Sequence, residues 1–337
     1  MPLEPRLTIT IRSLLQKRIV CAWLLAFGIV AMFLFSRKAA AAGQQDFYHR
    51  LRHGGRTRTY EVHVPPNYDG RTPLPVVLNI HGGGGDAPAC RRQTQMDKAA
   101  DRDGYIAVYP EGTSAIGKFY TWNAGICCAY AVKWKVDDVG FISKLLDELP
   151  KQYAVDTNRV YATGMSNGAM MCYRLACELS NRITAICAVS SGQGVDGPRP
   201  ARPVPVMHIH GLKDPNALFA GGVGPNAISK VQHKPIRDVI AWWLDVDNCL
   251  KKPVEVIKQP DFIMERYAPA PGEVGEPVVL YMLPEGGHTW PGGVDVTPRL
   301  GTGKLIATFD ANARMWDFFR HFSLAAKQPQ PASAKNQ

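Results

Sequence analysis

The chain has 337 residues, of which 46% are hydrophobic and 20% are charged, and its formal net charge is +10. This composition excludes a disordered chain and a collagen-like repeat, and eight cysteines are too few for a dense disulfide scaffold. Residues 1–58 hold ten Lys and Arg against two acidic residues, so they account for +8 and the other 279 residues for +2. A nucleic-acid partner is therefore not expected for the main body of the chain.

The first expected element is an uncharged apolar run over residues 19–35, which lies between Lys17-Arg18 and Arg37-Lys38. Its length falls between that of a signal-peptide core and that of a membrane-spanning helix. Small residues follow at 39–43, where a signal peptidase could cut. We expect residues 1–42 to be a signal peptide or an N-terminal membrane anchor. The domain that follows would be exported to the periplasm or the outside of the cell, and it would stay on the membrane through residues 19–35 if the run is not cut.

Apolar strands and helices alternate through the rest of the chain. Residues 43–57 are polar and basic, so we expect a linker there, and the polar tail 326–337 reads as disordered. Strands are expected at 58–64, 75–80, 105–109, 160–163, 183–189, 204–209 and 278–283, and helices at 91–102, 136–149, 167–179 and 310–322. This alternation predicts an α/β domain over 58–325, with a mostly parallel central sheet and helices on both faces.

A glycine-rich loop, His81-Gly82-Gly83-Gly84, follows the strand expected at 75–80. Glycines let the backbone approach a ligand closely and turn its N–H groups inward. In a serine hydrolase such a loop donates a hydrogen bond to the developing oxyanion, and we expect Gly83 to be the donor, with Gly82 or Gly84 beside it. A phosphate loop is the alternative, but the GK[ST] that it requires is missing.

Seven cysteines lie outside the apolar run, so at least one of them has no partner within the chain. Their number fits an oxidising compartment only weakly, and no Cys or His spacing resembles a zinc site. Cys127 and Cys128 are adjacent, and we expect each to bond to another partner rather than to its neighbour.

Gly164-Met165-Ser166-Asn167-Gly168 is a G-x-S-x-G that follows an expected strand and opens an expected helix. This is the setting of a nucleophile elbow, a turn so sharp that the residues flanking the serine must be small. We expect Ser166 to be the nucleophile and the Asn167 N–H to be the second oxyanion donor. An ordinary turn with a capping serine is the alternative.

The acid and the base should follow the serine in the order Asp or Glu, then His, each on a loop after a strand. Asp214 follows the strand at 204–209, and His288 lies in a glycine-rich loop after the strand at 278–283. We expect Asp214 to orient the imidazole and His288 to act as the base. Asp196 and Asp245 remain alternatives for the acid. His233 and His321 lie in less suitable segments, and His321 reads as a packed or surface histidine.

Together these motifs resemble the α/β-hydrolase esterases of the polyhydroxybutyrate depolymerase and feruloyl esterase group. The resemblance runs from about Thr59 to Phe322 and rests on HGGGGD at 81–86, YPEG at 109–112, TWNAGICC at 121–128, VDDVGFI at 136–142, GMSNGAM at 164–170, HGLKDP at 210–215 and GGHTWPGG at 286–293. It implies Ser166, Asp214 and His288 as the triad, and residues 122–138 as a wall of the active-site entrance. The segment after Asp214 departs from the pattern that is common in relatives, which bears on the substrate and not on the triad.

The expected activity is hydrolysis of carboxylic esters through an acyl-enzyme, without a metal or a cofactor. The resemblance favours a polyhydroxybutyrate depolymerase-like esterase; a feruloyl or acetylxylan esterase that acts on plant polysaccharide is the alternative. A non-catalytic envelope binding protein and a peptidase on the same fold are further alternatives. Trp122 and Trp290, with Trp134, are candidates to stack on a ferulate or a sugar, and core packing is the competing explanation for them.

Overall fold

The computed structural model describes residues 45–115, 117–195, 198–296 and 301–324. The leader expected at 1–42, with its apolar run 19–35, and the tail expected at 326–337 lie outside these ranges. Among the described residues, no helix combines the length and the apolar character that crossing a bilayer requires.

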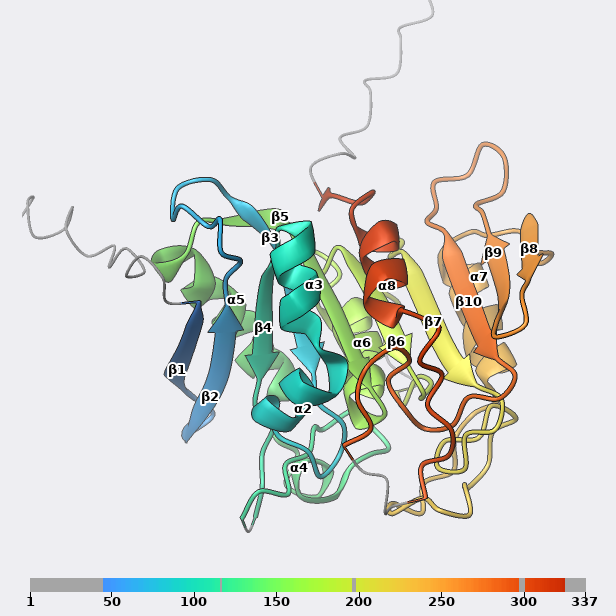
Figure 1. Ribbon diagram of the computed structural model, residues 1–337, viewed down its shortest axis with the longest axis horizontal. Coiled ribbons are helices and arrows are strands. Elements are labelled where there is room, and N and C mark those ends of the chain that lie inside the picture. The colour runs from blue at the N-terminus through green and yellow to red at the C-terminus, as the bar shows by residue number, and fades with distance from the viewer. Residues whose placement is uncertain (1–44, 116, 196–197, 297–300, 325–337) are drawn as a thin grey trace, which may run out of the picture. The chain divides into compact units, whose positions relative to one another are not determined.

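Ten strands form one sheet in the order β1-β2-β4-β3-β5-β6-β7-β10-β9-β8 (Figure 1). The strands are β1 (Asp46–His53), β2 (Arg56–His63), β3 (Leu74–Ile80), β4 (Ile106–Pro110), β5 (Val155–Met165), β6 (Ala185–Val189), β7 (Val206–Gly211), β8 (Glu255–Lys258), β9 (Ile263–Tyr267) and β10 (Val278–Leu283). The pairs from β4 to β10 are parallel, and the pairs outside them are antiparallel. Strands β6, β7 and β10 are buried along their whole length, as expected for a sheet covered on both faces.

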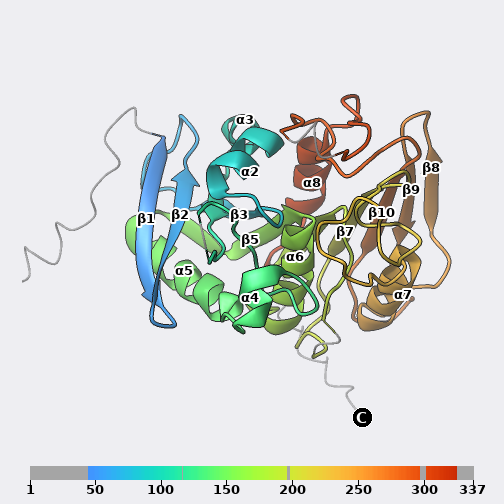
Figure 2. The ribbon, with the colours of Figure 1, turned by 90° about the horizontal axis from the view of Figure 1, so that it is seen from below.

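The helices cover both faces of this sheet. They are α2 (Ala87–Thr94), α3 (Met96–Asp103), α4 (Ala129–Lys133), α5 (Asp138–Gln152), α6 (Asn167–Glu178), α7 (Ile236–Val246) and α8 (Ala311–Phe319). Figure 2 shows α2, α3 and α8 on one face and α5, α6 and α7 on the other. Two buried apolar clusters correspond to these faces, one with residues of α5 to α7 and the other with residues of α2, α3 and α8. The predicted mostly parallel sheet between two helical layers is therefore confirmed.

The prediction of a linker over residues 43–57 is wrong, because β1 occupies Asp46–His53 and β2 begins at Arg56. The two strands form an antiparallel hairpin through Gly54-Gly55, whose φ angles are 54° and 73°. A two-residue glycine turn with positive φ is a strong hairpin signal. The strand escapes a search for apolar runs because only every second residue, such as Phe47 and Leu51, points toward the protein. The domain therefore begins at or before residue 46 and not at residue 58.

The helix expected over 91–102 is two helices, since Gln95 breaks it in the left-handed conformation with φ 53°. Helices α4 and α7 and strands β8 and β9 are further additions to the predicted elements. Strand β8 is short and mostly exposed. It therefore lacks the apolar run by which the central strands are predicted.

Candidate active site

Ser166 occupies a sharp turn between β5 and α6. Its backbone angles are φ 57° and ψ −121°, a left-handed conformation that a residue with a Cβ rarely adopts. A Cβ on Gly164 would lie 2.6 Å from the Ile80 carbonyl oxygen, and one on Gly168 would collide with the same oxygen. The two glycines are therefore required because β3 passes directly beneath the turn. The nearby chain holds the strained serine in place through a 2.9 Å hydrogen bond from its N–H to the Val189 carbonyl.

The Ser166 hydroxyl is not used to cap the helix that follows. Helix α6 has no side-chain hydrogen bond at its N-cap, which is Ser166, and the side chain is partly exposed. The alternative of an ordinary capping serine therefore does not describe this residue. Its Oγ lies at the N-terminus of α6, where the helix dipole favours negative charge.

Asp214 and His288 meet because their strands, β7 and β10, are parallel neighbours. The loops after the two strands are also tied together, since Leu212 N–H donates to the Leu283 carbonyl at 2.9 Å and Lys213 N–H donates to the Gly286 carbonyl at 3.0 Å. A Cβ on Gly211 would collide with the backbone of Gly286, so this approach requires glycine. The result is a 2.8 Å hydrogen bond between His288 Nδ1 and Asp214 Oδ2.

The Asp214 side chain has no exposed surface, yet it stays ionised. Burial alone would raise the pKa of this carboxyl, but the charge and hydrogen bond of His288, with help from His210 and the Ala217 N–H, lower it below its ordinary value. A buried carboxylate in this position fixes the imidazole so that Nδ1 carries the hydrogen and Nε2 is free to accept a proton.

The other acid and base candidates lie elsewhere. Asp245 is in α7 and pairs with Lys251 on the surface, and His321 is exposed. Asp196 lies outside the described residues. His233 is partly buried, and burial lowers its pKa. Among the described residues, no hydrogen bond joins Ser166 to His288; in free hydrolases this contact is often long and tightens when substrate binds.

The glycine loop lies against the nucleophile turn. Ideal Cβ positions on Gly82 and Gly83 are each 3.5 Å from the Cβ atoms of Ser166 and Asn167, respectively. Gly84 N–H already donates to the Tyr120 carbonyl at 2.8 Å, which removes Gly84 as a donor to the oxyanion. Within the described residues, no hydrogen bond is recorded for the N–H of Gly83 or of Asn167. These are the two N–H groups that the sequence predicts as donors.

A network of buried polar groups holds this loop, in which His81 is the positioning residue that the sequence favours over a catalytic base. The His81 ring donates from Nδ1 to the Gly82 carbonyl at 2.7 Å and accepts at Nε2 from Gly112 N–H at 3.0 Å. Trp122 Nε1 donates to the His81 carbonyl at 3.0 Å. The Asn167 amide accepts from Trp122 N–H at 2.8 Å and donates to the carbonyls of Trp122 and Cys127. The sequence signal for the part played by residue 167 is a second polar residue directly after the serine.

The prediction that Trp122 and Trp290 stack on the substrate is wrong. Their side chains are 0% and 1% exposed, so neither offers a free ring face. Each indole N–H bonds within the protein, Trp122 to the His81 carbonyl and Trp290 to the Asn312 amide oxygen. Core packing, the competing explanation, describes both. Trp134, at the end of α4, is 60% exposed.

Cys127 and Cys128 are bonded to each other, which corrects the expectation of other partners. The other five cysteines among the described residues are free and buried. The disulfide borders the oxyanion loop: Cys128 Sγ is 3.9 Å from an ideal Cβ on Gly83, and both sulfurs lie within 4 Å of Ser229 Oγ. Residues 127–128 and the loop around Ser229 thus form one side of the site.

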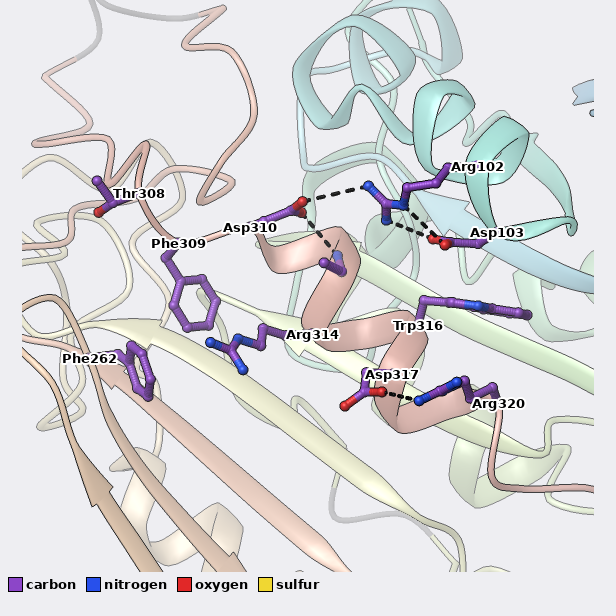
Figure 3. Close-up of a pocket in the computed structure, with 11 residues that line it drawn as sticks. Arg102, Asp103, Phe262, Thr308, Phe309, Asp310, Arg314, Trp316, Asp317 and Arg320 are labelled. Carbon is purple, nitrogen blue, oxygen red and sulfur yellow. Dashed lines mark hydrogen bonds and ion pairs between the residues drawn. The ribbon is translucent and has the colours of Figure 1, made fainter.

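Two other features outside this site have a simpler explanation. A pocket of about 520 Å³ beside α8 contains none of the predicted site residues, and its Arg and Asp side chains largely pair with each other (Figure 3). Ligand atoms of Asp46, His63 and Asp97 come within 4.8 Å of one another. The Arg91 guanidinium already contacts both carboxylates, so the positive charge beside them comes from this arginine.

Known proteins resemble this chain in sequence and in fold. The family described as "Esterase PHB depolymerase" matches residues 58–230. The esterase NocK of Nocardia uniformis subsp. tsuyamanensis is 32% identical over 260 residues, which cover 71% of this chain and 72% of that protein. The feruloyl esterase B of Piromyces equi is 29% identical over 274 residues, 78% of this chain and 45% of that protein.

The match to a third relative is shorter. The bifunctional acetylxylan esterase/xylanase XynS20E of Neocallimastix patriciarum is 33% identical over 164 residues, 48% of this chain and 22% of that protein. This chain thus spans less than half the length of two of these relatives. Among solved structures, the acetyl xylan esterase from Aspergillus awamori superposes with a TM-score of 0.53 at 16% identity, over 72% of this chain and 94% of that chain. This likeness concerns the fold alone, and it confirms the predicted α/β-hydrolase fold.

Proposed function

Because this chain belongs to the esterase family of the PHB depolymerases, we propose that it is a serine esterase that hydrolyses carboxylic esters through an acyl-enzyme. The observation that carries the proposal is the placement of Ser166. It lies on a strained turn with a free hydroxyl, beside unpaired N–H groups, in a fold that also joins a buried carboxylate to His288 at 2.8 Å.

In the proposed mechanism, His288 Nε2 takes the Ser166 proton as Oγ attacks the ester carbonyl carbon. The negative charge that develops on the carbonyl oxygen is met by the N–H groups of Gly83 and Asn167. The Asp214 carboxylate stabilises the imidazolium, which then gives its proton to the leaving alcohol oxygen. A water molecule repeats the attack on the acyl-enzyme, and Ser166 regains its proton. Each step uses only these groups and water, so we propose no metal or cofactor.

For the substrate, we propose a polyester oligomer of hydroxyalkanoate units, in line with the family. The feruloyl and acetylxylan esterase relatives favour an acylated polysaccharide as the second candidate. Turnover of hydroxybutyrate oligomers and of methyl ferulate by the same preparation separates the two. Faster turnover of methyl ferulate would reverse the order of the candidates.

For the cellular location, we propose export through residues 1–42, to the periplasm or the outside of the cell. The support is the apolar run 19–35 with its basic flanks, and this run remains the anchor if the leader is not cut. The catalytic domain would then be the part that begins with the β1–β2 hairpin. N-terminal sequencing of the purified protein tests whether cleavage follows Ala42.

The direct test of the activity is the Ser166→Ala variant. We expect it to lose cleavage of a short p-nitrophenyl ester by at least about 1,000-fold, because the acyl-enzyme no longer forms. It should also lose covalent labelling by a fluorophosphonate, which wild type should show. An inert binding protein would fail to label even as wild type, and a peptidase would label but prefer amide substrates. Ester cleavage that survives in Ser166→Ala would contradict the assignment.

A further inference from the structure

Three buried side chains outside the triad form a continuous hydrogen-bonded chain. Tyr173 of α6 contacts His208 Nδ1 at 2.8 Å, and His208 Nε2 contacts His210 Nδ1 at 3.0 Å. His210 Nε2 then contacts the Ala217 carbonyl oxygen at 2.7 Å. The two histidines alternate along β7, so they share one face of the sheet, and their rings stack with centroids 5.3 Å apart. All three side chains are fully buried.

The end of this chain fixes the direction of every hydrogen bond in it. A carbonyl oxygen can only accept, so His210 Nε2 must carry a hydrogen. In a neutral ring His210 Nδ1 is then an acceptor, which requires a hydrogen on His208 Nε2. His208 Nδ1 is left to accept from the Tyr173 hydroxyl. Burial lowers the pKa of both histidines, most strongly that of His208, and so keeps both rings neutral. Each donor thus has one acceptor, and a single pair of tautomers satisfies the chain.

The chain ends at the turn that holds the triad acid. Asp214 Oδ1 accepts from Asn216 N–H at 2.8 Å and from Ala217 N–H at 2.9 Å, which leaves Oδ2 for His288. The turn therefore sets the orientation of the carboxylate, and His210 holds the far side of the same turn through the Ala217 carbonyl. His210 Nε2 also lies 3.7 Å from Asp214 Oδ2, so the positive end of its N–H bond lies close to the carboxylate.

We propose that His210, kept in one tautomer by His208 and Tyr173, is a positioning residue that holds the Asp214–Ala217 turn so that the carboxylate faces His288. The proposal rests on the proposed function of the Ser166 site, but it adds a part that is not in the triad. His210 touches neither Ser166 nor the oxyanion loop in any recorded contact among the described residues, so it acts through Asp214. Without it, the turn would lose the hydrogen bond that ties its Ala217 carbonyl to β7.

The test compares His210→Leu with His210→Gln. The Leu variant removes the donor to Ala217, whereas the Gln amide restores a donor at the position of Nε2. We expect kcat for a p-nitrophenyl ester to fall at least about tenfold in His210→Leu with KM changed less than about twofold, since the substrate contacts remain. His210→Gln should recover most of the loss. Rates are counted per fluorophosphonate-reactive site, so that unfolded protein does not contribute.

A matched control is His63→Leu, because His63 is also a buried strand histidine with hydrogen-bonded partners and lies in β2, away from the triad. We expect it to lose stability while its kcat per reactive site stays at the wild-type value. Proton NMR gives a second readout: the downfield imidazole N–H signal of the His288–Asp214 hydrogen bond should broaden or move in His210→Leu and return in His210→Gln.

Two outcomes overturn the proposal: an unchanged kcat per site with an unchanged N–H signal in His210→Leu, or equal losses in His210→Leu and His63→Leu. If His210→Leu yields no folded protein, Tyr173→Phe replaces it, since this variant removes only the far-end donor. It should then lower kcat by about twofold or more and leave KM unchanged; wild-type kcat would again overturn the proposal. Failure of the proposed function itself is a separate result, because that appears as ester cleavage by Ser166→Ala.

Discussion

At the scale of single residues, the Asn167 side chain joins two loops that form the site. Its backbone N–H is the proposed oxyanion donor, while its amide bonds to both backbone groups of Trp122 and to the Cys127 carbonyl. The side chain is 2% exposed, so these bonds have no competition from water. One residue therefore supplies the proposed donor and also holds the wall beside it.

We expect Asn167→Ala to lower kcat/KM by about tenfold and stability by about 1–3 kcal/mol, because the buried Trp122 N–H loses its partner and the carbonyls of Trp122 and Cys127 each lose one of two donors. The backbone N–H of residue 167 remains, so the loss of activity reports the displaced wall. Steady-state kinetics and urea unfolding measure the two effects. The control is Asn312→Ala, which removes a buried amide of α8, on the face of the sheet opposite α6 (Figure 2), that bonds to Thr94 and Trp290. Equal loss of activity in the two variants would contradict this role.

His81 makes the oxyanion loop sensitive to acid. Burial lowers its pKa from the ordinary 6.5 to about 4, and both ring nitrogens are engaged as a neutral ring. Between pH 6.5 and 4 the unfolded chain binds a proton at this residue that the folded chain does not. Stability contributed by the neutral ring is therefore complete above pH 6.5 and is lost as the pH falls toward 4.

The expected loss from His81 is about 3 kcal/mol over this range. His81→Asn keeps a donor to the Gly82 carbonyl but removes the titrating group. We expect it to be less stable than wild type at pH 7.5 and to lose less stability than wild type between pH 7.5 and pH 5. Urea unfolding at the two pH values measures the difference. Parallel losses in the two proteins would show that His81 does not titrate as described.

At the scale of elements, the turn between β5 and α6 needs glycines on both sides of Ser166, because the Ile80 carbonyl at the end of β3 lies directly against it. We expect Gly168→Ala to destabilise the protein by about 2–3 kcal/mol and to reduce kcat, since the new Cβ pushes α6 and Ser166 away from the Ile80 carbonyl. Gly272→Ala is the control for a Cβ that meets no neighbour, because the space around its Cβ position is open; unlike Gly168, Gly272 has a positive φ. It should cost about 1 kcal/mol and leave kcat unchanged. Thermal unfolding and kinetics compare the pair.

The elements that the sequence predicts correctly are those with an unbroken apolar run, such as β3 and β10. Such a run has one stable location, between two helical layers, so residue type alone indicates it. Strand β1 lies at the edge of the sheet and alternates polar and apolar residues. Its sequence does not show which strand it pairs with, so the pattern alone does not predict its burial. Helices α2 and α3 are separated by the left-handed φ of Gln95, and glutamine is not a residue type that predicts a helix break.

In the site too, some features can be predicted from the sequence and others cannot. Asp214 and His288 are brought together by the order of the strands, which the chain order of the motifs reflects. The pairing of Cys127 with Cys128 and the burial of Trp122 both depend on the structure around these residues. Neither property belongs to the residue type, so both predictions failed. The same holds for His208 and His210, whose tautomers follow from a carbonyl seven residues further along the chain.

At the scale of the whole molecule, a buried ion pair ties the β1–β2 hairpin to the body of the domain. Arg58 of β2 contacts Asp138 of α5 at 2.7 Å, and both side chains are almost completely buried. The guanidinium also lies 3.9 Å from the centre of the Phe141 ring and donates to the Glu111 carbonyl. Asp138 in turn accepts from Asn123 N–H, next to the wall of the site.

We expect Arg58→Met to destabilise the protein by about 3–5 kcal/mol, because it leaves the Asp138 carboxylate buried without its partner. The double variant Arg58→Met, Asp138→Asn should recover part of this loss, since no buried charge remains and the amide oxygen still accepts from Asn123. Urea unfolding of the two proteins and wild type measures the difference. A double variant that is less stable than the single one would mean that the pair stabilises by more than charge neutralisation.

The two outermost strands of the sheet have a consequence for how copies of this protein meet. A strand with a bare flank is a template on which another chain can add a strand and begin to aggregate. Strand β1 presents Asp46, Arg50 and Arg52 to solvent, and β8 presents Glu255 and Lys258. Adding a second copy through β1 would bring two arginine-rich strands together, and β8 is only four residues long. We therefore expect the charges on these outer strands to oppose the addition of further strands from other copies.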